Sequence, residues 1–163
     1  MFSSLNRTKL IKNDLKGIAK LMYQDVSKDT WDQENLTKRN LDFTIESIRY
    51  IDAYTKRLCT TQAGSELLKN HFDNFVIRIG AYIGEIIKRN INQDFKWYEY
   101  DSVYHFSSAL DGVNRGIKTE TVLYSQKSDR VIVPLTVVAQ YLEGNSTHTD
   151  FLEYVEETIK QNS

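Results

Sequence analysis

Apolar residues in the first half of the chain recur every three or four positions, which is the spacing of one face of an α-helix. A first series, from Ile11 to Met22, predicts a helix over residues 5–26. A second predicts a helix over about residues 35–58. A third series, from Leu68 to Ile87, is the longest and widest, and predicts the most buried helix of the protein. Three N-terminal helices are therefore expected.

Beyond residue 90 the pattern changes to that of β-strands. Residues 96–100 are rich in aromatic side chains, and residues 119–124 and 130–133 are rich in β-branched and aromatic ones. The polar residues 125–129 between the last two segments have the length of a longer hairpin loop. A small antiparallel β-meander is the expected result.

Two short helices are predicted after the strands. Pro134 fits the first turn of a helix and Gly144 fits the position just past its end, so a helix is expected over residues 135–142. Thr147 or Thr149 is expected to cap a final helix. The fold class predicted from the pattern is α+β, with three N-terminal helices, a small antiparallel β-meander and two short C-terminal helices.

Composition supports one ordinary globular domain spanning residues 1–163, because 40% of the residues are apolar and 26% are charged. The single cysteine, Cys59, cannot form an internal disulfide, so a reducing, cytoplasmic location is expected. The sequence contains no apolar run long enough to span a membrane, and its start lacks the apolar core of a signal peptide. We therefore expect neither export by that route nor a membrane partner.

The distribution of charge bears on the class of partner. Residues 135–163 contain one lysine and five acidic residues, which gives the chain an acidic end that can steer a partner of opposite charge. The adjacent basic residues form isolated pairs, at 38–39, 56–57 and 88–89, rather than a dense stripe. Nucleic-acid binding needs such a stripe to contact phosphates, so no nucleic-acid partner is expected.

Catalytic and cofactor motifs are not found in the sequence. The three histidines, His71, His105 and His148, are far apart and none has the spacing of a metal site. The nucleophile elbow, the phosphate-binding loop and the dinucleotide fingerprint are all missing. We therefore expect no metal and no cofactor, and the sequence favours a binding protein over an enzyme.

Two glycines interrupt the most apolar helix. Gly80 and Gly84 each cost about 1 kcal/mol relative to alanine in a helix, and they lie one turn apart. They form a bare strip on which a neighbouring element can pack closely. Glu85 lies beside this strip, where it is expected to pair with Arg78, Arg89 or a tyrosine hydroxyl.

Two alternatives to this packing interpretation remain open. In the first, Glu85 and Asp52 line a pocket with Tyr82 and Trp97, as in a small ligand-binding protein or a hydrolase that uses two carboxylates. Sequence spacing leaves open whether Glu85 and Asp52 share a pocket. In the second, the chain is a homo-oligomeric structural component and the glycine strip is a contact between subunits. The oligomeric state is left open.

Part of the chain resembles a group of small, uncharacterised bacterial domains. The resemblance rests on residues 46–54 (ESIRYIDAY), on residues 80–90 (GAYIGEIIKRN) and on Trp97. In that group a Ser-x-x-x-x-Asp-x-Tyr-like helix precedes a Gly-Ala-Tyr-Leu-Gly-Glu-like helix and a strand that begins with tryptophan. The resemblance covers residues 45–160, but Ile83 stands where leucine is commoner, and asparagine and glutamine replace the usual glycines before the tryptophan.

Members of that group look like immunity-type proteins found near secreted toxins, and the resemblance implies no catalytic residues. Our leading hypothesis is therefore a non-enzymatic, bacterial, protein-binding domain that neutralises a cognate toxin by direct binding. Aromatic anchors and a charged rim are common in tight interfaces. The candidate contacts are Tyr98, Tyr100, Tyr104, Glu153, Glu156 and Glu157.

Overall fold

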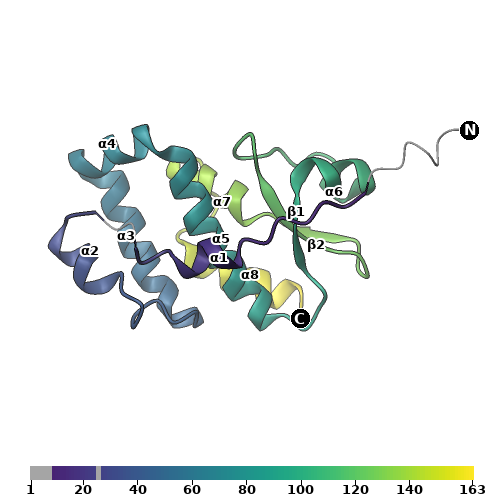
Figure 1. Cartoon of the computed structure of the whole chain (residues 1–163), viewed down its shortest axis with the longest axis horizontal. Coiled ribbons are helices and arrows are strands. Elements are labelled where there is room, and N and C mark those ends of the chain that lie inside the picture. The colour runs from purple at the N-terminus through teal and green to yellow at the C-terminus, as the bar shows by residue number, and fades with distance from the viewer. Residues whose placement is uncertain (1–8, 25–26) are drawn as a thin grey trace, which may run out of the picture.

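The computed structural model describes residues 9–24 and 27–163 and has the predicted α+β class (Figure 1). Its sheet is an antiparallel meander of three strands, β1 (Lys96–Glu99), β2 (Thr121–Ser125) and β3 (Arg130–Ile132), in the order β1-β2-β3. The sheet lies toward one end of the molecule and a group of helices forms the other end. The central helix α5 (Phe72–Asn90) connects the two parts.

The remaining helices have the following bounds: α1 (Lys16–Lys20), α2 (Thr30–Asn35), α3 (Ile48–Thr60), α4 (Gln62–Asn70), α6 (Tyr100–Phe106), α7 (Pro134–Leu142) and α8 (Phe151–Gln161). Two short 3-10 turns, η2 (Ile45–Ser47) and η3 (Ser108–Leu110), precede α3 and follow α6. Within the described part of the chain, none of these helices has the length and apolar character needed to cross a bilayer.

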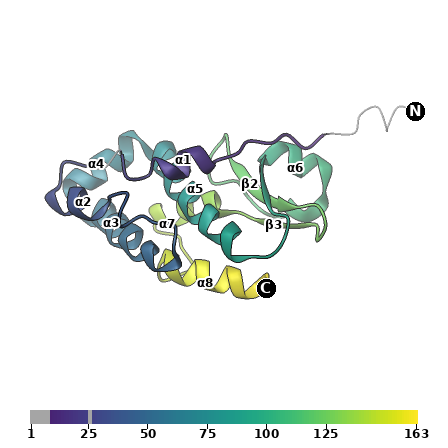
Figure 2. The ribbon, with the colours of Figure 1, turned by 60° about the horizontal axis from the view of Figure 1, so that its bottom comes forward.

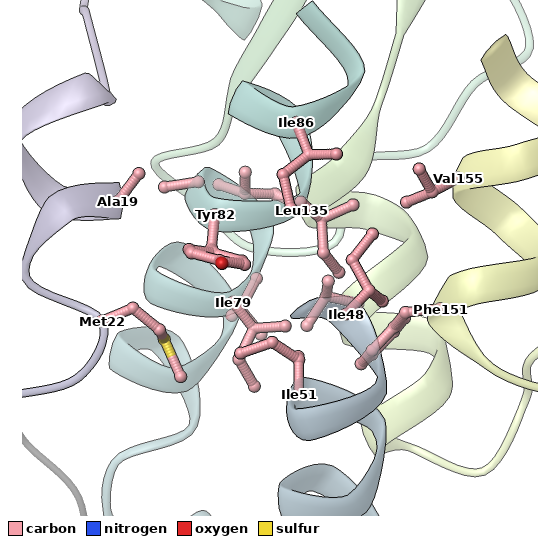
Figure 3. Close-up of a cluster of buried hydrophobic side chains, with 14 of the residues drawn as sticks. Ala19, Met22, Ile48, Ile51, Ile79, Tyr82, Ile86, Leu135, Phe151 and Val155 are labelled. Carbon is pink, nitrogen blue, oxygen red and sulfur yellow. The ribbon is translucent and has the colours of Figure 1, made fainter. Parts of the chain in front are cut away.

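The main core surrounds α5, which contributes more buried residues than any other helix of the described chain, although a larger fraction of the shorter α7 is buried. Ile79, Ile83 and Ile86 are fully buried in this helix. Each buried isoleucine side chain contributes roughly 1.5–3 kcal/mol relative to an exposed one. Figure 3 shows α1, with Ala19 and Met22, on one side of α5 and α8, with Phe151 and Val155, on the other.

The sheet is covered on both faces. Trp97 pairs with Leu123, which pairs with Ile132, so these three side chains share the face that packs into the main core. On the other face Tyr98 and Tyr124 belong to a second, smaller core. This second core lies beneath α6 and η3, which therefore form a layer of their own.

The first predicted helix, over residues 5–26, is wrong in most of its length. Residues 5–8 and 25–26 lie outside the described residues, and helix is found only over Lys16–Lys20. Before α1 the backbone pairs with β1. The Glu99 N–H donates to the Ile11 carbonyl (2.8 Å), and the Asn13 N–H donates to the Trp97 carbonyl (3.1 Å). The free edge of β1 therefore supplies hydrogen bonds that compete with helix formation in this segment.

The second and third predicted helices are each divided. Helix α3 begins only at Ile48, and the chain before it turns at Phe43, which has a positive φ of 64°. The third pattern is divided at His71, which has φ −134° and ψ 33° and separates α4 from α5. In the second pattern the apolar spacing continues through the break because the buried loop residue Leu41 also faces the core. In the third it continues because Leu68 of α4 and Val76 of α5 are both buried in that core.

From β2 onward the chain follows the prediction closely, but α6 and η3 were not predicted, and Tyr100, expected in the first strand, begins α6. Helix α7 has Pro134 in its first turn, and β2 and β3 form the expected hairpin. The cap of α8 differs, because the carboxylate of Asp150, rather than Thr147 or Thr149, accepts the Glu153 N–H (2.8 Å). Aspartate is among the strongest N-capping residues, so this choice needs no tertiary cause.

Candidate functional site

The glycine strip of α5 is filled by other parts of the same chain. A Cβ atom at Gly80 would lie 2.6 Å from a methyl carbon of Leu135 in α7, and one at Gly84 would overlap the ring of Trp97 in β1. The strip therefore lets α7 and β1 pack directly on the α5 backbone. Because its surface is buried inside the chain, the strip is not a contact between subunits, and this form of the oligomer hypothesis is wrong.

Glu85 is buried beside the strip and is bound by two donors. The Trp97 indole N–H donates to its Oε2 (2.8 Å), and the Lys88 ammonium lies 3.1 Å from the same atom. These partners differ from Arg78, Arg89 and the tyrosine hydroxyl expected from the sequence. The contact with Trp97 was not predicted, because it crosses from a helix to a strand.

Asp52 has a different set of partners, at the start of α8. Its carboxylate accepts the backbone N–H groups of Phe151 (2.7 Å) and Leu152 (3.1 Å), so it ties α3 to α8. Burial raises the pKa of Asp52 to about 6, although these two hydrogen bonds act in the opposite direction. Asp52 and Glu85 share no partner, so their contacts do not join them as an acid and base pair.

Tyr82, the remaining member of the proposed pocket, is also occupied elsewhere. Its hydroxyl lies 2.6 Å from the Ser47 hydroxyl and accepts the backbone N–H of Phe43 (3.1 Å). Tyr82 thus fastens α5 to the segment before α3. Of the four residues proposed for a pocket, Glu85 and Trp97 are joined by a hydrogen bond.

The six predicted contact residues divide into two groups. Tyr98 and Tyr100 are buried in the second core, so they are not exposed anchors, although Tyr100 lines the hollow described below. Tyr98 is buried because α6 and η3 cover its face of the sheet, and Tyr100, the first residue of α6, belongs to the same core. Tyr104 has 48% of its surface exposed. The α8 glutamates, Glu153, Glu156 and Glu157, are exposed as expected.

Tyr104 belongs to a continuous exposed group on α6, which we call the aromatic surface: Tyr104, His105 and Phe106. Phe106 has 41% of its surface exposed, and its ring packs edge-on against Tyr124 of the sheet (6.2 Å between centroids). The rings of Tyr104 and His105 are also perpendicular to one another, with centroids 5.3 Å apart. Tyr104 and His105 thus contact one another, and Phe106 contacts the sheet.

An open hollow of about 720 Å³ adjoins the aromatic surface. Tyr100 and Leu110 are its buried residues, and Tyr104 and the loop 112–115 stand around them. The rings of Tyr100 and Tyr104 are nearly parallel, with centroids 6.3 Å apart and planes inclined by 12°. Stacking on the buried Tyr100 therefore gives the exposed Tyr104 ring a fixed orientation beside the hollow.

The loop beside the hollow is fastened to Tyr100. The Tyr100 hydroxyl donates to the Val113 carbonyl, and burial raises the pKa of Tyr100. Gly112 has a positive φ of 79°, which permits the turn before Val113. Arg115 lies with its guanidinium 4.5 Å from the centre of the Tyr100 ring and pairs with Asp101. The position of Arg115 is thus set by a cation–π contact and an ion pair.

Sequence analysis identified two residues of this site: Tyr100, which the structure buries at the hollow, and the exposed Tyr104. His105 and Phe106 follow it directly, so the run of three aromatic residues was an available signal. Arg115 had no such signal, since its contact with Tyr100 depends on the folded loop. The site combines tyrosine and arginine, and these residues are enriched among the interface positions that contribute most to the free energy of binding.

Within residues 9–24 and 27–163, no three His, Cys, Asp or Glu side chains lie close enough together to hold a metal ion. The chemistry that the aromatic surface offers is recognition by stacking, apolar contact and hydrogen bonding. No family model matches the chain, and no curated protein or solved structure is significantly similar to it.

Proposed function

We propose that this chain is a non-enzymatic protein-binding domain that recognises its partner through the aromatic surface and the adjacent hollow. The observation that carries the proposal is the exposure of Tyr104 beside Arg115 at the hollow, with Phe106 also exposed on the same helix. Exposed apolar groups clustered on one element mark interaction sites more often than scattered ones do. Tyrosine and arginine are also the residues that most often dominate the free energy of protein association.

The hollow suits an apolar or aromatic side chain that projects from a partner. Tyr104 supplies one aromatic face, and the buried Leu110 supplies an apolar base. Arg115 adds hydrogen-bond donors at the rim, because a guanidinium carries five N–H groups and the contacts with Asp101 and Lys118 use two of them. A carboxylate or a backbone carbonyl of the partner is the natural acceptor for the others.

The narrower form of the proposal is that the partner is a toxin, which this chain neutralises in a bacterial cytoplasm by covering its active site or blocking its assembly. This form rests on the resemblance of residues 45–160 to immunity-type domains. The exposed acidic residues of α8 would then steer a basic partner toward the chain rather than provide most of the affinity.

A ligand-binding or hydrolytic role centred on Glu85 and Asp52 is the competing proposal. Two cooperating carboxylates must both reach the reacting group. Here Glu85 is held by Trp97 and Lys88, and Asp52 is held by the first turn of α8. Each carboxylate thus has a structural role that is sufficient to explain its burial.

The test is a quantitative pull-down from the native lysate with the tagged chain and three variants. Tyr104→Ala and Arg115→Ala should each reduce recovery of a stoichiometric partner by about tenfold or more, as expected for truncation of a dominant contact. Gln62→Ala is the control, because Gln62 is exposed on α4, which lies at the far end of the molecule from α6 and outside every surface proposed for binding. Equal recovery with the wild type and with both site variants would contradict the proposal.

The narrower form has its own readout. A toxin-like protein recovered in this way, and encoded beside this chain, should lose its toxicity on co-expression with the wild type but keep it with Tyr104→Ala. A partner that is not toxic would refute the immunity role while leaving the protein-binding role in place.

A further inference from the structure

A second exposed apolar group lies on the N-terminal segment, residues 9–22, which we call the lysine strap. Three of its side chains face the interior, Leu15, Ala19 and Met22. Three aliphatic side chains face outward instead, with exposed fractions of 49% for Ile11, 37% for Ile18 and 45% for Leu21. The strap is thus anchored by one face and displays apolar groups on the other.

The outward face of the strap is also basic. Four exposed lysines accompany one exposed aspartate, Asp14: Lys9, Lys12, Lys16 and Lys20. Only five large apolar side chains are strongly exposed among the residues that the structure describes, and three of them lie on this strap. Exposed aliphatic groups set among charges of one sign are the pattern of a docking face.

The opposite pattern occurs on α8. Its outward side carries Glu153, Glu156 and Glu157, with Asp150 at the N-cap and Lys160 as the basic residue. An open hollow of about 520 Å³ lies along this side and has Leu152 among its lining residues. The α8 face therefore offers acidic side chains around a hollow, where the strap offers lysines around projecting aliphatic side chains.

The two faces cannot meet within one molecule. Helices α1 and α8 pack on opposite sides of α5, as Figure 3 shows for their buried residues and Figure 2 shows for the whole chain. The exposed residues of each helix point away from α5, since the buried ones point toward it. Two copies of the chain, stacked with the strap of one against α8 of the next, would bring the faces together.

We propose that this chain self-associates head to tail, through the lysine strap of one copy and the acidic face of α8 in another. The charge complementarity of the two faces selects a second copy as the occupant. Because the contact joins two different surfaces, it propagates into open chains or closes into rings rather than stopping at a two-fold dimer. Exposed ion pairs each contribute little, so the association is weak and is screened by salt.

This inference does not depend on the proposed function. The aromatic surface lies on α6 at the sheet end of the molecule, whereas α1 and α8 lie beside α5 (Figure 1). Only the start of the strap reaches α6, where the Ile11 N–H donates to the Ser102 hydroxyl (3.0 Å). A contact centred on the exposed side chains of α1 would leave Tyr104 and Arg115 accessible. Variants of the strap therefore test the assembly, and variants at Tyr104 and Arg115 test partner binding, whereas variants of α8 would also slow the encounter with a basic partner.

The experiment is sedimentation velocity across a range of concentrations, with two charge-reversed variants. One variant carries Lys12→Glu, Lys16→Glu and Lys20→Glu, and the other carries Glu153→Lys, Glu156→Lys and Glu157→Lys. The wild type should show a weight-average mass that rises with concentration in low salt and falls to the monomer value at about 1 M salt, where the Debye length is about 3 Å. Each variant alone should remain a monomer.

Mixing the two variants is the decisive step, because each then meets a face of opposite charge on the other. The mixture should recover the concentration-dependent association that each variant has lost, which also shows that both are folded. A control with Lys96→Glu, Lys118→Glu and Lys127→Glu changes the net charge equally at exposed positions outside both faces, and it should associate like the wild type. A wild type that stays monomeric at all concentrations, or a mixture that does not associate, would overturn the proposal.

Discussion

The indole N–H of Trp97 donates to the carboxylate of Glu85 across 2.8 Å, and this bond ties the first strand of the sheet to the central helix. Both residues are buried, and the Trp97 ring rests on the backbone at Gly84, one residue before Glu85. The position of β1, and with it the start of α6, therefore depends on a contact between two segments that the sequence pattern treats separately. The aromatic surface is thus built on a sheet that α5 holds in place.

Replacing Glu85 separates a structural role from a catalytic one. Glu85→Ala leaves the buried Trp97 N–H without its acceptor and should lower the free energy of unfolding by about 1–3 kcal/mol. Glu85→Gln retains an acceptor oxygen for Trp97 and should cost less. Urea unfolding followed by circular dichroism measures both. A fully stable Glu85→Ala variant would contradict the structural role and favour the competing catalytic one.

Gly84 and Gly17 differ in the space around an added Cβ atom, so alanine substitutions at these two positions form a matched pair. Gly84→Ala forces a methyl group into the Trp97 ring and should destabilise the fold by about 1–3 kcal/mol, as overpacking of a filled core does. Gly17→Ala lies in α1 with no atom within 4 Å of the new methyl group. It should stabilise the fold by about 0.5–1 kcal/mol through helix propensity. Unfolding midpoints of the two variants should therefore move in opposite directions.

Asp52 should make stability depend on pH in a defined window. Its pKa is about 6 in the folded protein and its ordinary value is 3.8, so the folded state binds more protons than the unfolded state between these values. The contribution of Asp52 to stability is therefore fully present below about pH 4 and is lost as the pH rises through about 6. Since one pKa unit corresponds to about 1.4 kcal/mol, the effect is on the order of 1–3 kcal/mol.

The comparison that isolates this effect is between the wild type and Asp52→Asn, by urea unfolding at several pH values from 4 to 7. Asparagine does not titrate, so the stability of the wild type should fall relative to the variant as the pH rises. A constant difference across this range would show that the Asp52 carboxyl does not titrate there. Other groups, including Asp29 and Asp129, whose pKa values are lowered, affect both proteins equally.

The tyrosines of the sheet end should separate into structural and surface residues. Tyr98→Ala removes a side chain that is 4% exposed and should cost about 3–5 kcal/mol, as large core truncations do. Tyr104→Ala removes a half-exposed ring and should cost less than about 1 kcal/mol. Thermal unfolding of both variants checks this order. If Tyr98→Ala were as stable as Tyr104→Ala, the second core would be incorrectly described.

Sequence patterns correctly predicted the elements that depend only on residues close to one another along the chain. The apolar series of α5, the β2–β3 hairpin and the proline-initiated α7 depend on adjacent residues, and all three are found. The segment at Ile11 was predicted as helix because its spacing fits one, but its backbone bonds to Glu99, far along the chain. The spacing of apolar residues indicates which side chains are buried, but it does not show that the edge of a distant strand will form hydrogen bonds with the segment.

In the candidate site, too, some residues could be predicted from the sequence and others depend on tertiary packing. Tyr98, Tyr100 and Tyr104 were all predicted as exposed contacts, but the packing of α6 and η3 on the sheet, a tertiary feature, buries Tyr98 and Tyr100. Arg115 could not be found from the sequence, since only the folded loop places its guanidinium over the Tyr100 ring. Aromatic content indicated that a recognition surface was available, but burial decides which rings form it.

The most direct test of the protein-binding surface is photo-cross-linking from a benzoylphenylalanine placed at position 104, compared with one at position 62 on α4, at the far end of the molecule (Figure 1). Both positions are exposed, so both probes can react with a bound protein. The account predicts that irradiation in the native lysate yields one dominant adduct from position 104, absent from position 62 and suppressed by Arg115→Ala. A partner cross-linked equally from both positions, or from position 62 alone, would contradict it.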